Sequence, residues 1–516
     1  MIKKRIVALL VCLALLLTGC GTGSGNNKDG EGAENNVATE QEITLLYCQN
    51  DTLNPFNTIS KLNAELGLLM FEPLVKLDNK FEIITALADS VLLDGLVCTV
   101  TLKNAVFSDS SPVTADDIIY SYTKAKESDR FSSLFYEVQS VNALDAKSVV
   151  FTLNRHDPYF AKLLTFPIIK SGSDKLKNED NVELAPIGAG RFVFDSEKKC
   201  LLQNDKFYGE KPTVTTIKLI NAPDNESMEH YVEVGATDIY FADQGDENII
   251  RMSGKRQAVN LNNLVYLGIN HYYGPLKSDL LRYAISSAVD RTILSQNAFF
   301  TNALPATGFF HPSWEEVSNY QTLPLGADLK ISVENLANIG YNELDKEGFR
   351  LNSNGSRLEL SLLVNKDNVA KLTAANLIAE QLKSACIKIN IEAVSEAEFH
   401  SRIRSGSFQL YIGEIKLQAN MDISSLVLAT GPASYGIAPP AANGVFDAET
   451  SYDAVVRGFY SGQYNMVDVA TALLSSMPVI PLLYREAVVF YSDDITDFGD
   501  SAYSDIFLSI DKYKFK

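Results

Sequence analysis

The first twenty residues have the pattern of an export signal rather than of part of a domain. They therefore indicate the cell compartment in which the rest of the chain folds. Three cations, Lys3, Lys4 and Arg5, precede an apolar run from Ile6 to Leu17. A helix that spans a bilayer needs about 20 apolar residues, so this run is too short to cross a membrane. A charged start, a short apolar core and a small-residue end are typical of a secretory signal peptide. We therefore predict that the remaining chain folds outside the cytoplasm.

The apolar run ends at a cysteine, which predicts a lipid anchor. The sequence LTGC, ending at Cys20, resembles a bacterial lipobox, in which the chain is cut before the cysteine and that cysteine is lipid-modified. We expect residues 1–19 to be the removable signal peptide and Cys20 to carry the lipid. Residues 20–41 have almost no apolar side chains and cannot offset the entropy of ordering, which predicts a disordered tether. The expected location is the outer face of the cytoplasmic membrane, or the periplasm.

Chain length, charge and cysteine spacing exclude several classes of protein. A chain of 516 residues is too long for one compact core, so we expect two or three lobes. A formal net charge of −19 disfavours nucleic acid as a partner, because phosphate binding needs clustered cations. No segment after the signal is long and apolar enough to span a membrane. The cysteines after Cys20 are widely spaced and lack a C-x-x-C motif, which favours free thiols over a disulfide framework.

Hydrophobic spacing along the chain predicts a mixed α/β protein. An opening strand is expected at residues 42–48. A helix is expected within 112–126, because Thr114 and Asp117 have the spacing of a capping box. A β-α-β unit with parallel strands is expected near the end, with strand, helix and strand at residues 357–365, 369–385 and 387–394.

A further helix is predicted over residues 278–291, with the sequence SDLLRYAISSAVDR. Its apolar residues recur at helical spacing and form one stripe. The stripe comprises Leu280, Leu281, Ala284, Ile285, Ala288 and Val289.

Several segments, in chain order, resemble a single family. The segments are FEPLV with its flanks (53–90), VTLKNAVFSDSSPVTADD (100–117), PIGAGRFVF (186–194), NDKFYGEKPTVTTIKL (204–219), LGINHYYGPLKSDLLRYAISSAVDRTIL (267–294) and LIAEQLKSACIKINI (377–391). Together they are similar to the extracellular solute-binding proteins of family 5, the oligopeptide-, dipeptide- and nickel-binding lipoproteins of ABC importers. Each segment is weak alone, and their common order makes the resemblance specific.

The resemblance implies an α/β architecture of the periplasmic-binding-protein type II fold. Two lobes joined by a hinge close over a ligand, and an extra α/β lobe is attached. The implied segments are 42–73, 182–262 and 489–516 for lobe I, 74–181 for the extra lobe II, and 263–488 for lobe III. The strands that cross between the lobes are expected near 260–270 and 488–492, where a hinge lets the lobes close.

The implied function is binding rather than catalysis. The expected role is to capture a small solute, most simply a short peptide, and to deliver it to an ABC permease with its ATPase, the receptor acting as a monomer. The alternative is a sensor for a peptide, a nickel complex or another solute that feeds no importer. No G-x-S-x-G or H-E-x-x-H motif occurs. We expect no cofactor and no metal site, although nickel capture through His271 stays open.

The segment LYIGEIKLQANMDISSL (410–426) is where oligopeptide-binding relatives carry a carboxylate for the ligand's amino terminus. The position of that acid is occupied by Leu417, and Asp422 lies further on. Glu414 is the candidate replacement for the amine anchor, and Lys416 is the candidate partner for an acid. The alternative is that Glu414 and Lys416 are solvated charges at a strand end.

Three further groups are candidate ligand-binding residues. Asp51, Thr52 and Leu53 follow the first strand, where ligand crevices of α/β proteins form; the alternative is a plain turn set by Asn54-Pro55. The stretch INHYYG offers Asn270, His271 and Tyr272, and GPASYG offers Tyr435. Tyrosines suit ligands because they bury area and keep a hydroxyl, but rings packed in a core are the alternative.

The lipid anchor makes a direct prediction. Cys20→Ala is expected to abolish fatty-acid labelling and to move the protein from the membrane fraction into the soluble fraction, because no other lipid site remains. Cys48→Ala is the matched control and is expected to stay labelled and membrane-bound. A Cys20→Ala protein that is still lipid-modified contradicts the prediction.

Overall fold

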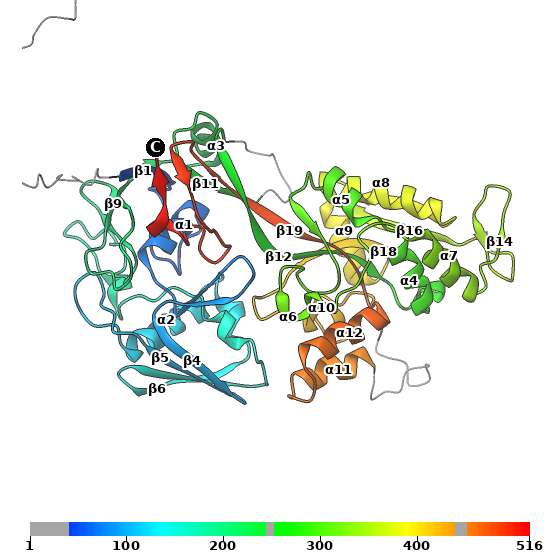
Figure 1. Ribbon diagram of the computed structural model, residues 1–516, viewed down its shortest axis with the longest axis horizontal. Helices are drawn as coiled ribbons and strands as arrows, with labels where there is room; N and C mark the ends of the chain where they lie inside the picture. The colour runs from blue at the N-terminus through cyan, green and yellow to red at the C-terminus, as the bar shows by residue number, and fades with distance from the viewer. Residues whose placement is uncertain (1–40, 244–251, 439–450) are drawn as a thin grey trace, which may run out of the picture. The chain divides into compact units, whose positions relative to one another are not determined.

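The computed structural model describes residues 41–243, 252–438 and 451–516 (Figure 1). The predicted signal peptide 1–19 and the predicted lipid site Cys20 lie outside these residues. Helices and strands alternate through the described chain, and three sheets have four or more strands. No described helix is long and apolar enough to cross a membrane.

The first sheet begins with the strand expected at the start of the mature domain. It contains β1 (Gln41–Tyr47), β10 (Val214–Asn221), β9 (Cys200–Gln203) and β8 (Phe192–Asp195), in that order. β1 and β10 are parallel and the other pairs are antiparallel. Helix α1 (Lys61–Met70) follows β1 and packs against β1 and β8.

The sequence of α1 explains both its start and its buried face. The Ser60 side chain accepts a hydrogen bond from the Asn63 backbone amide and so caps the first turn. Leu62, Leu66 and Leu69 recur at helical spacing and are all buried. Full burial of a leucine side chain contributes about 2 kcal/mol, so this face holds the helix on the sheet.

The second sheet is antiparallel. Its order is β4 (Ala88–Asp94), β5 (Val97–Leu102), β7 (Ser148–Leu153) and β6 (Val138–Asp145). Helix α2 (Ala115–Glu127) packs against β6 and β7. The capping box expected from Thr114 and Asp117 is present at its start.

The largest sheet holds the β-α-β unit expected near the chain's end. Its order is β11 (Ile239–Ala242), β19 (Ile480–Tyr491), β12 (Lys255–Ile269), β18 (Leu410–Lys416), β16 (Glu359–Asn365) and β17 (Lys388–Val394), and β13 (Ala303–Pro305) also pairs with β19. β16 and β17 are parallel and are linked by α8 (Val369–Ser384), so the unit is confirmed.

The long strands β12 and β19 lie side by side and connect the part of this sheet that contains β11 to the part that contains β18 (Figure 1). The first half of β12 pairs with the stretch of β19 that also pairs with β11. The second half of β12 pairs with β18. The β12–β19 ladder is interrupted between Asn260 and Leu264, opposite Glu486 and Tyr484. A bend in the chain costs least where ladder hydrogen bonds are already missing.

The helix predicted over 278–291 is wrong in its length. The structure has α4 (Asp279–Ser287) followed by a separate α5 (Arg291–Asn297). Asp290 starts the second helix, because its side chain accepts a hydrogen bond from the Ile293 amide. Leu280 is 39% exposed and does not belong to the apolar stripe, whereas the other five predicted residues are buried.

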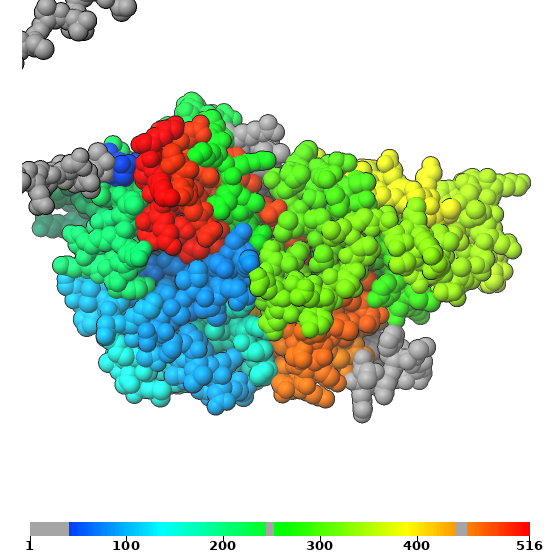
Figure 2. All heavy atoms as spheres, viewed as in Figure 1, coloured from blue at the N-terminus to red at the C-terminus, as the bar shows by residue number. Residues whose placement is uncertain are grey.

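The C-terminal residues complete the core beside the first sheet, and Figure 2 shows them (red) against residues from the beginning of the domain (blue). A buried ionic group joins these segments. Arg191 contacts Asp505 at 2.6 Å and donates to the Phe507 carbonyl at 2.8 Å. Lys76 contacts Asp505 at 3.1 Å and Glu72 at 2.9 Å.

The remaining elements complete the lobes. They are β2 (Val75–Leu77), β3 (Ile83–Thr85), α3 (Asn225–Glu233), α6 (Glu315–Ser318), α7 (Leu329–Asn338), β14 (Glu343–Leu344), β15 (Arg350–Leu351), α9 (Glu396–Ser405), α10 (Ser424–Val427), α11 (Tyr452–Phe459), α12 (Met466–Ser476), β20 (Ile495–Asp497) and β21 (Lys514–Phe515), besides five short 3₁₀ turns. The four cysteines of the described chain are free thiols, as expected. The segment limits of the three lobes stay a prediction.

Candidate functional site

The carboxyl ends of β16, β17 and β18 meet at one edge of the large sheet, because these strands are parallel. Such an edge is where α/β proteins form ligand crevices. Glu414 lies on β18 near its carboxyl end and is held there by three side chains. Its carboxylate accepts from Asn263 Nδ2 at 2.9 Å and from Arg485 Nη1 at 2.8 Å. Lys371 Nζ, from the first turn of α8, lies 2.9 Å from its other oxygen.

Glu414 is therefore a paired ion inside the protein. Its side chain is 13% exposed, and that of Arg485 is 6% exposed. Burial raises the pKa of Glu414, but the charges of Lys371 and Arg485 outweigh burial and lower it to about 2. At neutral pH the carboxylate is ionised and already shared by two cations, so it is not free to anchor a ligand's ammonium group.

Arg485 extends this group across the interrupted ladder. Besides Glu414 it contacts Asp243, which directly follows β11. Arg485 itself lies on β19 at the interruption. A single guanidinium thus joins the carboxylate of Asp243, next to β11, to the carboxylate of Glu414 on β18. With Lys371 included, two acids are paired with two cations.

Lys416 points to a different partner. Its Nζ donates to the Tyr503 hydroxyl at 2.6 Å and lies 4.1 Å from the centroid of that ring. Tyr503 comes from the C-terminal segment, and its ring centroid is 6.3 Å from that of Phe241 on β11. Lys61, the first residue of α1, donates to the Phe241 carbonyl at 2.9 Å. The last residue of β18 is thereby brought to the start of α1.

The predicted residues after β1 form a turn with local hydrogen bonds. Asp51 Oδ2 accepts from the Ser60 amide at 2.7 Å and from the Ile59 amide at 3.0 Å. Burial raises the pKa of Asp51, but the hydrogen bonds that it accepts outweigh this and lower it. Thr52 Oγ1 accepts from the Asn54 amide, and Leu53 packs on the core. These residues shape the loop that leads into α1.

The predicted residues after β12 lie far from Glu414 and Lys416. Asn263 is opposite Lys416, whereas Ile269 is opposite Leu410 at the other end of β18. At about 3.3 Å per residue, Asn270 lies about 23 Å along the strand from Asn263. The structure therefore does not bring the group after β12 to the carboxyl edge of the sheet.

This distant group has structural contacts of its own. Asn270 donates to the Phe408 carbonyl at 2.8 Å, and His271 Nε2 lies 2.9 Å from the Pro478 carbonyl oxygen. Burial lowers the pKa of His271 to about 4, and Arg282 acts in the same direction. Tyr272 is 65% exposed, and Tyr435 packs against the core. Nickel capture through His271 gains no support from these contacts.

The position where relatives carry an amine-binding acid is also occupied. Leu417 is buried in the core. Asp422 accepts from Arg155 Nη2 at 2.5 Å and from the Tyr460 hydroxyl at 2.5 Å. The guanidinium of Arg155 also stacks 3.7 Å from the Tyr460 ring centroid. The chain's own arginine thus takes the place that a ligand ammonium group needs at Asp422.

Comparison with known proteins now identifies the family. The model for bacterial extracellular solute-binding proteins, family 5 Middle, matches residues 82–435. The chain belongs to this family. It is the solute-binding component of an ABC importer and not an enzyme. The resemblance drawn from the sequence, and the fold that it implied, are confirmed.

This family 5 protein has distant relatives with different ligands. The oligopeptide-binding protein AppA of Bacillus subtilis (strain 168) is 24% identical over 428 residues, which cover 76% of this chain and 77% of that protein. The nickel-binding periplasmic protein of Escherichia coli (strain K12) is 23% identical over 431 residues, 79% of this chain and 78% of that protein. The unliganded open form of the periplasmic murein tripeptide-binding protein MppA has a TM-score of 0.71 at 18% identity, covering 89% of this chain and 94% of that chain.

Sequence reasoning missed Arg485, Lys371, Asp243 and Tyr503 in this family 5 protein. Arg485 carried a signal, because a charged residue inside the apolar run IPLLYREAVVFY needs a partner if the strand is buried. Nothing local in the sequence points to Asp243 or Tyr503, since their partners come from distant segments.

The ion pairs of Glu414 predict a specific stability loss. Glu414→Gln is expected to lower the free energy of unfolding by about 3 kcal/mol, because it removes the acidic partner of Lys371 and leaves Arg485 with Asp243 alone. Urea unfolding followed by fluorescence of Trp314, the single tryptophan, measures it. The pKa of Glu414 is lowered from 4.5, so the stabilisation is present above pH 4.5 and is lost as the pH falls toward 2.

Glu486→Gln is the matched control for Glu414→Gln. Glu486 is also on β19 next to Arg485, and burial alone raises its pKa. Removing its charge is expected to leave the stability unchanged or slightly higher. Equal losses for the two variants would contradict the role assigned to Glu414.

Proposed function

We propose that this protein is a lipid-anchored receptor that captures a short peptide between its lobes and delivers it to an ABC permease. The observation that carries the proposal is the convergence of charged side chains from α8, β18 and β19 and from the end of β11. They meet where the two long strands β12 and β19 lose their regular pairing. A solute bound at this place contacts segments on both sides of the interruption.

Capture by closure explains why the interruption matters. A ligand that contacts both lobes favours the closed form by its differential affinity for that form. We place the bend for this motion at the irregular ladder between Asn260 and Leu264, where the regular pairing of β12 and β19 is interrupted. The proposed lipid on Cys20 and the tether 20–41 keep the loaded receptor near its permease, which raises the effective concentration.

A peptide fits the described residues better than a bare metal ion. No group of three or more His, Cys, Asp or Glu side chains within the described ranges has the arrangement of a metal site. The relative AppA is named as oligopeptide-binding, which supports the same ligand class here. Because Asp422 is held by Arg155 and Glu414 by two cations, we propose that the amino terminus of the peptide is not the main anchor.

A ligand panel tests this function. Mixtures of di- to pentapeptides are expected to raise the melting temperature of the mature protein, because binding to the native state stabilises it by about 2.7 kcal/mol at 100 times Kd. Sugars, opines and nickel–histidine are the comparison ligands and are expected to leave the melting temperature unchanged. Stabilisation by nickel–histidine or by sugars, with none by peptides, would reject the peptide proposal.

A further inference from the structure

Three exposed cations from separate parts of the chain lie near Tyr503 or near its neighbour Phe241. Lys416 comes from the end of β18 and donates to the Tyr503 hydroxyl. Lys61 comes from the start of α1, and its Nζ lies 4.7 Å from the centroid of the Phe241 ring that neighbours Tyr503. Arg130 follows α2 and is close enough to Tyr503 for the two groups to interact electrostatically. We call Lys61, Arg130, Lys416 and Tyr503 the cation cluster.

The three cations of this cluster form no ion pair with an acid of the described residues. Within the described ranges, none of the three has a carboxylate oxygen within 4.0 Å. The nearby acids Asp243 and Glu414 are both bound by Arg485. A protein with a net charge of −19 has many acids available for pairing, so unpaired cations at one place suggest that a ligand supplies the negative charge.

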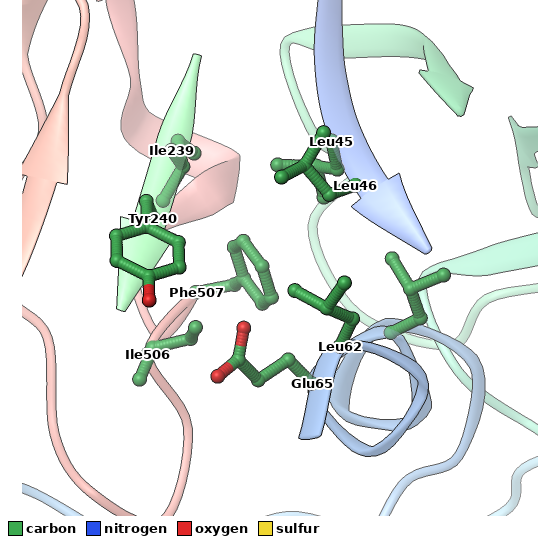
Figure 3. A pocket seen from close by; sticks show the side chains of 9 residues that line it. Leu45, Leu46, Leu62, Glu65, Ile239, Tyr240, Ile506 and Phe507 are labelled. Carbon is green, nitrogen blue, oxygen red and sulfur yellow. The ribbon is translucent and has the colours of Figure 1, made fainter. Parts of the chain in front are cut away.

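An acid that interacts electrostatically with two of these cations, Lys61 and Arg130, sits in an apolar pocket, shown in Figure 3. Glu65 on α1 projects into this pocket, and its Oε1 is buried with no hydrogen-bond partner in the described chain. Burial raises the pKa of Glu65 to about 7, although Lys61 and Arg130 act in the opposite direction. The other lining residues are leucine, isoleucine and aromatic side chains, among them Tyr240.

We propose that the cation cluster is a subsite for a carboxylate of the bound solute, which makes the substrate an acidic solute or a peptide held by its carboxyl end. The inference rests on the proposed function and names the chemistry of its ligand. Lysine and arginine donate charge-assisted hydrogen bonds to a carboxylate. The Tyr503 hydroxyl accepts from Lys416, so its own proton is available for the same carboxylate.

The cluster also links ligand binding to closure. Lys61, Arg130 and Lys416 fall in the segments expected for lobe I, the extra lobe and lobe III. A carboxylate among them offsets the mutual repulsion of three cations, and only in a conformation that brings the three together. Anion binding and lobe closure therefore support one another.

Glu65 makes the affinity depend on pH. The charged and titratable groups that face it are Lys61 on its own helix, Arg130 after α2, and Tyr240 on β11. As the pH falls through about 7, Glu65 takes up a proton and its negative charge disappears. The cluster then becomes more positive, so the subsite binds a carboxylate more tightly at pH 6 than at pH 8.

Two blocked peptide mixtures test the subsite by thermal shift and calorimetry. One is a randomised tripeptide mixture acetylated at the amino end, which keeps the carboxylate. The other is the same mixture amidated at the carboxyl end, which keeps the ammonium group. A third probe is a mixture of succinate, glutarate and citrate, which carries carboxylates without a peptide.

The acetylated mixture is expected to bind, and the amidated mixture is not. Lys61→Met, Arg130→Met and Lys416→Met are each expected to weaken binding about tenfold, the effect of losing one charged hydrogen bond. Lys103→Met, which removes a lysine that lies over the Tyr208 ring, is the matched control and leaves binding unchanged. Glu65→Gln is expected to bind at pH 8 as tightly as the natural protein binds at pH 6.

The other outcomes distinguish a failure of the carboxylate subsite from a failure of the peptide proposal. Equal binding of the acetylated and amidated mixtures overturns the carboxylate subsite and leaves the peptide proposal standing. Binding of the organic acids alone, with loss in the Lys61→Met variant, supports the subsite and overturns the peptide proposal. Binding of no probe, or binding that all three cation variants leave unchanged, overturns the subsite.

Discussion

The arrangement of the proposed binding region depends on the double ion pair of Arg485. This buried guanidinium sits where the β12–β19 ladder is interrupted and holds Asp243 on one side and Glu414 on the other. Because a buried charge without a partner is costly, each member constrains the others. The ends of β11 and β18 are thereby kept at fixed positions relative to β19. Lys371 completes the group and ties the start of α8 to the same point.

This constraint changes how ligand recognition is understood. Glu414 and Asp422 are the acids of this segment that are suited to bind a ligand's amino group. Both accept hydrogen bonds from arginines of the chain itself. The charges near the crossing that form no ion pair with a described residue are instead the cations Lys61, Arg130 and Lys416. Because these two acids are paired inside the chain and no described acid is paired with these cations, the protein is suited to a ligand that brings a carboxylate.

Much of the fold could be predicted from the sequence, because its signals are local. The capping box at Thr114 and the β-α-β unit ending at β17 follow from spacing over a few residues. The motifs in order along the chain identified the family. The predicted 278–291 helix failed because Asp290 caps a new helix, a signal that the apolar stripe hides. The site was less predictable, since Asp243, Lys371 and Arg485 meet only through long-range strand pairing. Asn270 and His271 were chosen by motif, and β12 carries them to the other end of the sheet.

The central claim is that a solute bound at the strand crossing draws the lobes together. Small-angle X-ray scattering of the mature protein, with and without the probe mixture that raises its melting temperature most, tests this claim directly. We expect a smaller radius of gyration when the ligand saturates the protein, and no change when the same ligand is added to the Lys61→Met variant at a concentration that leaves it unbound. An unchanged radius of gyration in the saturated natural protein would contradict the claim, because the ligand would then bind without closing the lobes.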